Sequence, residues 1–318
     1  MYVSEAEKYN KINKFTLGTA QLGMDYGIAN ITGKPSKSDA VLIIKQAVKS
    51  GINGIDTAPA YGDAEIKIGE ALEGESAKNI SVITKLDTFQ NFSSDESEKN
   101  VYQAVNQSIL KSCHNLRTKQ IHTLLLHRWE HRFTYQQTIW KALLDLKEGG
   151  YINKLGVSVY TPEEAIQALK EPEIAHIQLP FNLIDWRWKA SNFFEFLRQR
   201  SDVVIHARSV FLQGLLIGNL STWNKLEDSK GIDWITKLDK LVQELGRENK
   251  TDLCLAYVRS QTWINSIVIG VDSLLQLKEN IRLFQTPLLT NEQSEIVEEM
   301  LGGATDELLN PTKWKINL

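Results

Sequence analysis

The stretch Gly51-Ile-Asn-Gly-Ile-Asp56, followed five residues later by Tyr61, is the part of the sequence from which the fold can be built outward. It is a short apolar run of strand length that ends in a charged residue. Two more runs have this form, Ile80-Ser-Val-Ile-Thr-Lys85 and Ile121-His-Thr-Leu-Leu-Leu-His127. In a barrel of alternating strands and helices, the carboxyl ends of the strands converge on one face. Four side chains are therefore predicted to share one pocket, and we call them the tetrad: Asp56, Tyr61, Lys85 and His127.

Apolar runs of strand length alternate along the chain with segments of helical period, which favours a parallel sheet built from β-α units. The predicted strands cover residues 15–19, 54–56, 80–84, 121–126, 154–157, 175–179, 203–207 and 266–269. The predicted helices cover residues 37–50, 63–72, 97–112, 134–148, 162–169, 189–200, 232–246 and 274–284. Eight such units predict an α/β fold of the closed (β/α)8 TIM barrel type.

The length of 318 residues fits one barrel domain over residues 1–318, with an amino-terminal extension at 1–14 and a carboxyl-terminal segment at 285–318. Ser38-Asp39 and Thr161-Pro162 are predicted helix starts. The segment 214–231 is longer than an ordinary β-α loop, and long loops on a catalytic face are often lids. A doubly wound open sheet is the structural alternative. It usually carries Gly-x-Gly-x-x-Gly after its first strand, and the chain does not have that spacing there.

Composition narrows the classes of partner. The 36 basic and 39 acidic residues give a net charge of −3 without a basic stripe, so nucleic acid is not an expected partner. The chain has two cysteines, Cys113 and Cys254, which fits a reducing compartment better than a disulfide framework. No apolar stretch reaches the length of about 18 residues that a membrane span requires, and the polar start lacks the apolar core of a secretory signal. We therefore expect a cytoplasmic protein that does not bind membranes.

The four residues of the tetrad have complementary roles in proton transfer. A tyrosine hydroxyl has a reference pKa of about 10, so proton donation at neutral pH needs assistance. An ammonium beside the phenol favours the phenolate, and a carboxylate keeps that ammonium charged. These considerations make Tyr61 the proton donor, assisted by Lys85 and Asp56. His127 is expected to hydrogen-bond the substrate oxygen. Since no side chain can supply a hydride, the chemistry also implies an organic redox cofactor.

The motifs Gly54-Ile-Asp-Thr-Ala-Pro-Ala-Tyr-Gly62, Ile83-Thr-Lys85 and Leu124-Leu-Leu-His127 resemble the signature of the aldo/keto reductases. The resemblance extends from about Phe15 to Phe284. It implies a barrel that binds a nicotinamide dinucleotide in an extended pose and reduces an aldehyde or ketone. The sequence around residues 17–30 and 208–214 further resembles a bacterial branch associated with surface-sugar metabolism. A polar carbonyl such as a keto-sugar or sugar aldehyde is therefore the expected substrate.

The resemblance also implies a set of cofactor contacts. Gly18 and Thr19 match the end of the first strand, and Ser158 and Gln178 match the residues that hold the carboxamide. Residues 208–214 match a loop over the nicotinamide and pyrophosphate, and residues 269–280 match an adenosine clamp. The implied cofactor-binding residues are Gly18, Thr19, Asp56, Ser158, Gln178, Arg208, Ser209, Phe211, Gln213, Gly214, Gly270, Gln276, Glu279 and Asn280.

The chain departs from the family pattern at four positions. Val159 replaces an Asn that contacts the carboxamide, and Arg208 replaces an aromatic ring that stacks on the nicotinamide. Gly270 and Gln276 stand where some relatives place Lys and Arg on the 2′-phosphate of NADP. The cofactor is thus NADP or NAD: the resemblance slightly favours NADP, but these two positions do not. We consider Lys278 and Arg259 as compensating cations.

Aromatic side chains in predicted loops could form the wall of a substrate pocket or pack in loop cores. Tyr26 and Trp129 are our predicted substrate residues, and Trp186 and Trp188 are further candidates. The run of Trp140, Leu143, Leu144 and Leu146 repeats at helical spacing and is predicted to be core. Arg208 could instead anchor a substrate carboxylate or phosphate, although we favour a cofactor contact.

Two other classes of function are alternatives. His122, His127 and His131 raise the question of a metal-dependent hydrolase. However, His122 and His127 would point to opposite faces of a strand, so we predict no metal site. Some relatives bind the cofactor tightly and act as regulatory subunits of ion channels with little turnover. The tetrad alone does not separate that class from a reductase. The sequence leaves the oligomeric state open.

Overall fold

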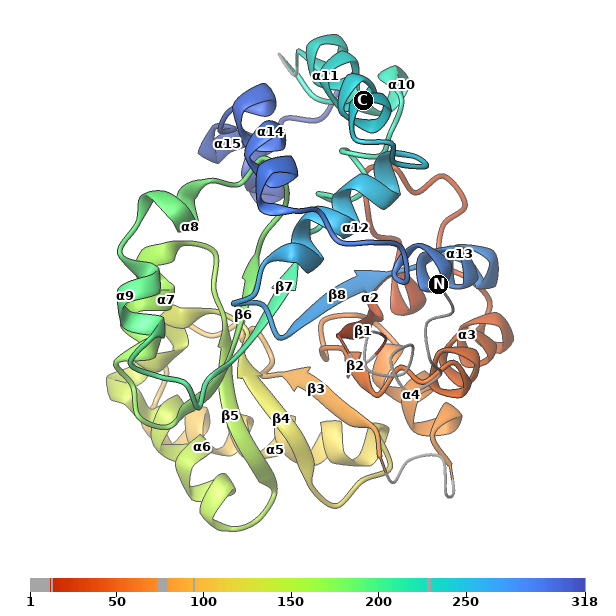
Figure 1. The fold of residues 1–318 in the computed structure, drawn as a ribbon. Coiled ribbons are helices and arrows are strands. Elements are labelled where there is room, and N and C mark those ends of the chain that lie inside the picture. The colour runs from red at the N-terminus through yellow and green to blue at the C-terminus, as the bar shows by residue number, and fades with distance from the viewer. Residues whose placement is uncertain (1–11, 13, 74–78, 94, 228–229, 318) are drawn as a thin grey trace.

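Eight parallel strands form a closed barrel in the order of the sequence (Figure 1). The computed structural model describes residues 12, 14–73, 79–93, 95–227 and 230–317. The barrel closes where Leu17 of the first strand pairs with Ile269 of the last. The strands are β1 Phe15–Gly18, β2 Gly54–Asp56, β3 Ser81–Lys85, β4 Ile121–Leu126, β5 Ile152–Ser158, β6 Ile174–Pro180, β7 Val204–Arg208 and β8 Ser266–Gly270. The predicted (β/α)8 barrel is therefore confirmed.

Helices surround the barrel and also lie across its ends (Figure 1). The longer ones are α3 Lys37–Lys49, α4 Ala64–Ala71, α5 Glu98–Asn115, α6 Thr138–Glu148, α7 Pro162–Leu169, α11 Gly231–Glu244, α12 Lys250–Ser260, α13 Leu274–Leu283 and α14 Asn291–Leu301. The short ones are α2 Ala20–Gly23, α8 Arg187–Ala190, α9 Phe193–Leu197, α10 Leu220–Trp223 and α15 Asp306–Leu309. In the described part of the chain, the 3-10 turns are η2 Trp129–Arg132, η3 Tyr135–Gln137 and η4 Pro311–Lys313.

The predicted helices differ from the structure at several points, one of which is the omission of α14. The predicted helix 189–200 is two short helices, because the chain is extended at Ser191, whose hydroxyl accepts a hydrogen bond from the Phe193 amide. Helix α12 was not predicted at all. The start of α3 is capped by Ser36 rather than at Ser38, since the Ser36 hydroxyl accepts the Asp39 amide proton. The predicted start at Thr161-Pro162 is confirmed, because Thr161 accepts the Glu164 amide proton ahead of α7.

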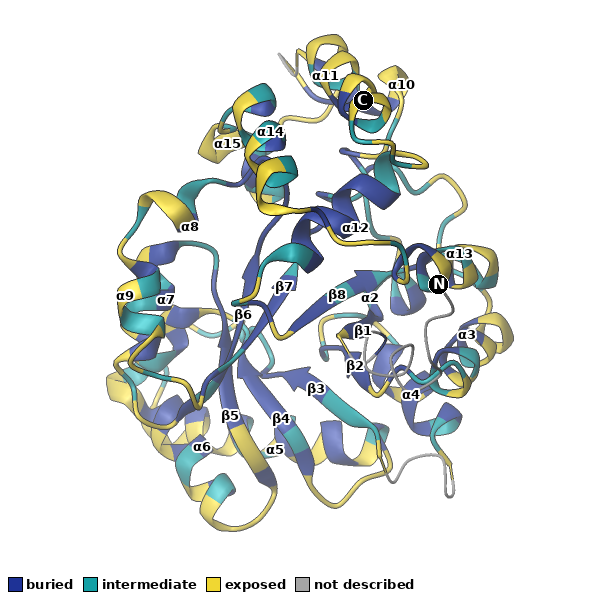
Figure 2. Ribbon diagram, in the orientation of Figure 1, coloured by how far each residue is buried: buried dark blue, intermediate teal, exposed yellow. Residues whose placement is uncertain are grey.

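The core has two layers, one inside the barrel and one between the strands and the surrounding helices. Every residue of β1 is buried, which is expected of a parallel strand covered on both faces. Figure 2 shows buried strands at the centre and exposed residues on the outer faces of the helices. On α6, Trp140, Leu143 and Leu146 are buried and Leu144 packs against them, so the predicted core stripe is confirmed.

The carboxyl-terminal segment lies over the strand ends and contacts the long loop after β7. Leu226 of that loop forms an antiparallel bridge with Ile316. The Lys225 ammonium donates to the Ile28 carbonyl at 2.7 Å, which links the loop to the segment after β1. The loop contains α10, and residues 228–229 lie outside the described residues. Its role as a lid stays a prediction. Of the predicted extension 1–14, the described residues include Ile12 and Lys14 only.

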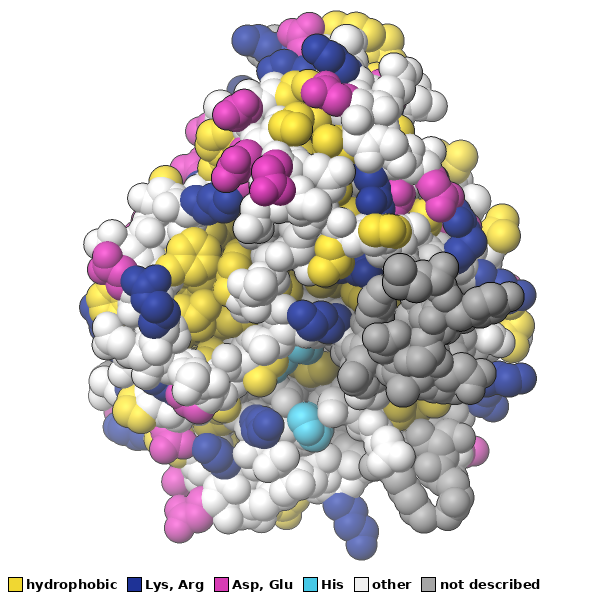
Figure 3. All heavy atoms as spheres, viewed as in Figure 1, with side chains coloured by type: hydrophobic (Ala, Val, Ile, Leu, Met, Phe, Trp, Pro, Cys, Tyr) yellow, Lys and Arg dark blue, Asp and Glu magenta, His cyan; other side chains and the backbone are white. Residues whose placement is uncertain are grey.

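Charged side chains of both signs are interspersed on the face shown in Figure 3. Within the described ranges, none of the helices is both long and apolar enough to cross a membrane.

Candidate active site

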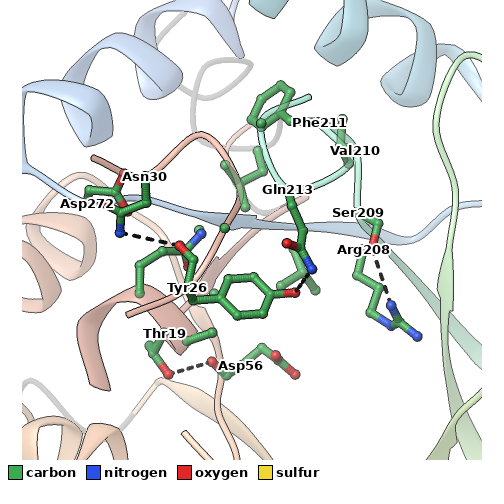
Figure 4. Close-up of a pocket in the computed structure, with 18 of the residues that line it drawn as sticks. Thr19, Tyr26, Asn30, Asp56, Arg208, Ser209, Val210, Phe211, Gln213 and Asp272 are labelled. Atoms are coloured by element: carbon green, nitrogen blue, oxygen red, sulfur yellow. Dashed lines mark hydrogen bonds between the residues drawn. The ribbon is translucent and has the colours of Figure 1, made fainter. Parts of the chain in front are cut away.

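The tetrad meets at the carboxyl ends of three neighbouring strands. Asp56 is the last residue of β2 and Lys85 the last of β3, while His127 follows β4 directly. Tyr61 lies in the loop between β2 and α4. All four line a cavity of about 690 Å³ that opens at this end of the barrel. Figure 4 shows part of the cavity, with Asp56 below Tyr26 and Gln213.

Asp56 and Lys85 form a buried ion pair at the floor of the cavity. The Lys85 ammonium is 2.9 and 2.8 Å from the two Asp56 carboxylate oxygens, and it also donates to the Thr57 carbonyl at 3.0 Å. The Lys85 side chain is 1% exposed and the Asp56 side chain 5%, so water screens the attraction between the two charges little. Burial alone would lower the pKa of Lys85, but Asp56 outweighs that effect and raises this pKa. The ammonium is therefore charged and fixed in position.

Gln178 of β6 forms the third side of the floor. Its amide nitrogen donates to Asp56 Oδ2 at 2.7 Å, so the carboxylate is held from both sides. Its amide oxygen is buried and has no hydrogen-bond partner. Ser158 of β5 lies beside it in register. An unpaired buried acceptor next to a hydroxyl fits the carboxamide group of a nicotinamide, because that group brings two N–H donors.

Tyr61 lies above the ion pair and next to His127. The Lys85 ammonium is 5.0 Å from the centroid of the Tyr61 ring, and the Tyr61 and His127 rings meet edge to face at 6.4 Å. Two glycines fix the loop that carries Tyr61. A Cβ at Gly23 would lie 1.8 Å from the Tyr61 carbonyl, and one at Gly62 would lie 2.3 Å from the Gly23 carbonyl. The loop thus packs backbone to backbone against α2, and larger side chains would displace it.

His127 is a neutral imidazole at physiological pH. Burial, with the Lys85 ammonium nearby, lowers the pKa of His127 to about 3. A neutral ring keeps one N–H donor and adds no charge to the cavity. It can therefore orient a carbonyl oxygen by a hydrogen bond, while the proton itself comes from another group.

The upper wall of the cavity consists of loop residues. Tyr26 lies over the tetrad, and its hydroxyl is 3.5 Å from the Gln213 amide nitrogen (Figure 4). Arg208 stacks on the Tyr160 ring, with 4.6 Å between the guanidinium carbon and the ring centroid. It donates to the Val159 carbonyl at 3.2 Å and the Ser209 hydroxyl at 3.3 Å. Burial, together with the nearby Tyr61 hydroxyl, raises the pKa of Tyr26.

The structure brings all fourteen predicted cofactor positions to one cavity. They extend from the strand ends of β1, β5, β6 and β7 to helix α13, and each contributes to the lining. The lining residues that sequence reasoning missed include Gln21, Tyr160, Thr251, Pro311 and Thr312, while Asp272 and Leu275 lie within the predicted clamp segment 269–280. Pro311 and Thr312 belong to the carboxyl-terminal segment. Its last residues have no pattern that points to the barrel mouth, so no sequence signal could have found them.

Four predicted aromatic and cationic positions lie away from the cavity. Trp129 is buried against Phe133, and its indole N–H donates to Gln167 at 2.8 Å, so it does not form part of the substrate wall. Trp188 is core, since its indole N–H donates to the Pro180 carbonyl. Arg259 is buried and donates to the Thr286 carbonyl. Trp186 is also absent from the lining residues.

Lys278 is exposed on α13 and does not line the cavity. The end of the cavity lined by residues 270–280 therefore lacks both compensating cations that we considered from the sequence. In the described part of the chain, no group of three or more His, Cys, Asp or Glu residues is placed to hold a metal ion. Cys113 and Cys254 are buried and free.

A barrel with a buried carboxylate-ammonium pair, a tyrosine and a neutral histidine at its strand ends is typical of oxidoreductases that reduce carbonyl groups. Comparison with known proteins gives the family. The family model for the aldo/keto reductase family matches residues 14–301. The chain therefore belongs to the aldo/keto reductase family, and it is an NAD(P)-dependent oxidoreductase.

Individual relatives are distant but cover the whole barrel. An uncharacterized oxidoreductase of Bacillus subtilis, YqkF, is 26% identical over 302 residues, which cover 90% of this chain and 96% of that protein. The NADH-specific methylglyoxal reductase of Escherichia coli is 24% identical, covering 91% of this chain and 98% of that protein. The holo structure of the aldo-keto reductase AKR11C1 from Bacillus halodurans has a TM-score of 0.74 at 23% identity, covering 92% and 93% of the two chains. This last likeness concerns the fold alone.

Proposed function

We propose that the protein reduces a polar, sugar-like aldehyde or ketone with NAD(P)H and that Tyr61 is the proton donor. One observation carries the proposal: Tyr61 and His127 lie next to each other in a cavity above a buried Asp56-Lys85 pair. Supporting evidence comes from two distant relatives named methylglyoxal reductase and glyoxal reductase, both of which reduce small polar carbonyls. The cytoplasmic location stays a prediction.

The residues of the chain fit a nicotinamide dinucleotide. The unpaired Gln178 oxygen and the Ser158 hydroxyl would hold the carboxamide, and Gly270 lets the Gln21 side chain pack against the end of β8, where a Cβ would lie 2.2 Å from the Gln21 side-chain oxygen. When bound, the reduced cofactor would supply the hydride. We propose that residues 208–214 and 270–280 hold the rest of the molecule. Arg208 then contacts the cofactor through a guanidinium already fixed against Tyr160.

The side chains divide the proton chemistry among them. His127, neutral because of burial, donates a hydrogen bond to the substrate oxygen and aligns the carbonyl. Tyr61 transfers its hydroxyl proton to that oxygen as negative charge develops there. The Lys85 ammonium stabilises the phenolate that remains, and Asp56 keeps the ammonium in place. Tyr26 closes the cavity from above, where it meets the polar substituents of the substrate.

Replacement of Tyr61 by Phe tests the proposal. We expect turnover of keto-sugars and sugar aldehydes to fall about 10²- to 10⁴-fold, because the proton donor is lost. Binding of the dinucleotide, measured by the quenching of tryptophan fluorescence, should be unchanged. Tyr151→Phe, an exposed tyrosine far from the cavity, is the matched control. Full activity of Tyr61→Phe would refute the role of Tyr61. Cofactor oxidation in a single turnover, with no steady turnover on any carbonyl, would instead indicate a regulatory binding protein.

A further inference from the structure

The cavity has two ends of opposite charge. The cations that line it, among the described residues, are Lys85, which belongs to the tetrad, and Arg208, whose charge acts on His127 of the tetrad. The opposite end lies where β8 leads into α13. There the charged lining residues are Asp272 and Glu279, both acidic. In the described lining, no Lys or Arg accompanies them. An anion bound at this end would therefore face negative charge.

The position of the tetrad decides which half of a dinucleotide reaches the acidic end. This step rests on the proposed function. Tyr61 can protonate only a carbonyl bound beside it, so the nicotinamide has to lie at the tetrad end. The adenosine half of an extended dinucleotide then falls to the α13 end. Leu275 lines the cavity there and is 78% exposed, which offers an apolar surface to a flat purine ring.

Among the residues that the structure describes, Asp272 has no cationic partner. Its side chain accepts one long hydrogen bond of 3.4 Å from the Gln276 amide, and its backbone N–H donates to the oxygen of the same amide at 2.8 Å. Burial raises the pKa of Asp272, and that amide offsets the effect only in part. Its carboxylate therefore has capacity to accept further hydrogen bonds from a neutral donor such as a hydroxyl group.

Glu279 shares a single cation with another carboxylate. Arg282 donates to Glu279 at 2.8 and 2.9 Å and to Glu248 at 2.6 and 2.9 Å. Two carboxylates around one guanidinium leave the group with net negative charge. Arg282 is also outside the residues that line the cavity. Four of the five guanidinium N–H groups of Arg282 donate to these two carboxylates, so a phosphate would have to compete with both of them.

We propose that Asp272 and Glu279 make the protein select NADH over NADPH. A ribose 2′-hydroxyl can donate a hydrogen bond to a carboxylate, as the acidic residue of dinucleotide-binding folds does. A 2′-phosphate has no donor when ionised and carries a charge of about −1.5 to −2 at pH 7, so the two carboxylates repel it. The amino-terminal end of α13 would attract an anion. However, the Ser273 hydroxyl already accepts the backbone amide proton of Gln276, and Asp272 adds a negative charge there.

Binding measurements with both cofactors test this selection without relying on activity. We expect the Kd of NADPH to exceed that of NADH by at least about tenfold at low ionic strength, as measured by quenching of tryptophan fluorescence. The gap should narrow with added salt, because screening weakens the repulsion at this accessible rim. In competition against NADH, 5′-AMP should displace better than adenosine 2′,5′-bisphosphate. These two nucleotides differ only in the 2′-phosphate, so the comparison isolates its effect on binding.

The double variant Asp272→Asn/Glu279→Gln should bring the ratio of the two Kd values close to one. Affinity for NADH should change less than about threefold, since each amide retains a carbonyl acceptor. Glu295→Gln/Glu299→Gln on α14 removes the same charge away from the cavity and should leave the ratio unchanged. Equal Kd values for NADPH and NADH would overturn the proposed selection, and so would a Kd ratio that the double variant does not alter. Neither result would contradict the proposed reductase function. Failure to bind either cofactor would overturn the proposed function itself.

Discussion

The floor and the upper wall of the cavity are built in different ways. On the floor, Asp56, Lys85 and Gln178 are almost fully buried and joined by hydrogen bonds of 2.7 to 2.9 Å. On the wall, Tyr26 and Gln213 come from loops, are partly exposed, and meet at 3.5 Å. Short contacts between strand residues fix the ion pair that assists the proton donor Tyr61. Loop residues held weakly are free to vary with the substrate, so the two regions should respond differently to mutation.

The largest effect is expected on the floor, from Lys85→Met. The change removes the ammonium from the proton-transfer site and leaves Asp56 buried with Gln178 as its remaining side-chain partner. We expect turnover to fall on the order of 10³-fold. The free energy of unfolding should also fall by about 3–5 kcal/mol, since an uncompensated buried charge remains. Denaturant unfolding and steady-state kinetics measure the two losses.

The control for this variant is Lys154→Met, which changes an exposed lysine on strand β5. It should change neither the turnover nor the free energy of unfolding appreciably. Near-normal stability and turnover in Lys85→Met would contradict the description of the floor as a locked, functional ion pair.

The loop that carries Tyr61 belongs to the floor in this comparison, and Gly62→Ala tests it. The added Cβ would lie 2.3 Å from the Gly23 carbonyl, so the loop must shift. We expect kcat to fall by about 10²-fold because the proton donor is misplaced, while dinucleotide affinity stays within about threefold. Gly246→Ala is the matched control, because Gly246 also has φ of +60° but its Cβ would have nothing within 4 Å. Equal losses in the two variants would show that backbone strain, rather than crowding, is responsible.

The floor could be predicted from the ends of the strands, whereas the wall was predicted only in part: Tyr26, Arg208 and Gln213 line the cavity and Trp129 does not. A strand places its last side chain at a defined edge of the barrel, so Asp56 and Lys85 could be located from apolar runs alone. Trp129 also follows a strand closely, but η2 turns its ring into a loop core against Phe133. Turn geometry of this kind depends on tertiary contacts that a single sequence does not reveal.

Secondary structure shows the same limit. Helix α12 was missed because residues 252–259 are all buried, so no polar face marks a helical period. Pro311 and Thr312 reach the cavity only because the final segment pairs with the loop after β7. Asp272 lies in the predicted adenosine clamp, but the sequence did not show that the described lining residues place no Lys or Arg beside it. Long-range packing, rather than local pattern, decides all three.

Beneath the floor, the barrel interior holds a histidine pair that should make stability depend on pH. His206 lies beside Gln178 in register, and its ring is 4.2 Å from that of His176. Burial lowers the pKa of His206 to about 4 and that of His176 well below its ordinary value. The unfolded chain takes up protons near pH 6.5, and the folded protein does not. Stability should therefore be complete above pH 6.5 and fall as the pH drops toward 4.

Unfolding in denaturant from pH 7 to pH 4 measures this dependence. His206 alone should contribute a loss of about 3 kcal/mol across that range. In His206→Asn the pH dependence should be reduced by this amount, whatever the change in stability at pH 7. The exposed His114→Asn should leave the dependence unchanged. If the free energy of unfolding depends on pH in His206→Asn as it does in the unsubstituted protein, the histidine pair is not the source of the acid sensitivity.

The smallest effect is expected on the wall, from Tyr26→Phe. The hydroxyl lost in this variant has one weak partner, Gln213, and faces the polar part of the proposed substrate. Removing one such group weakens a hydrogen bond worth about 1 kcal/mol, so KM for a keto-sugar should rise roughly fivefold with kcat almost unchanged. Affinity for the dinucleotide should not change. Trp129→Phe, an aromatic outside the cavity, should leave KM as it is. If kcat rather than KM fell in Tyr26→Phe, this tyrosine would act with the tetrad, and the division between floor and wall would be wrong.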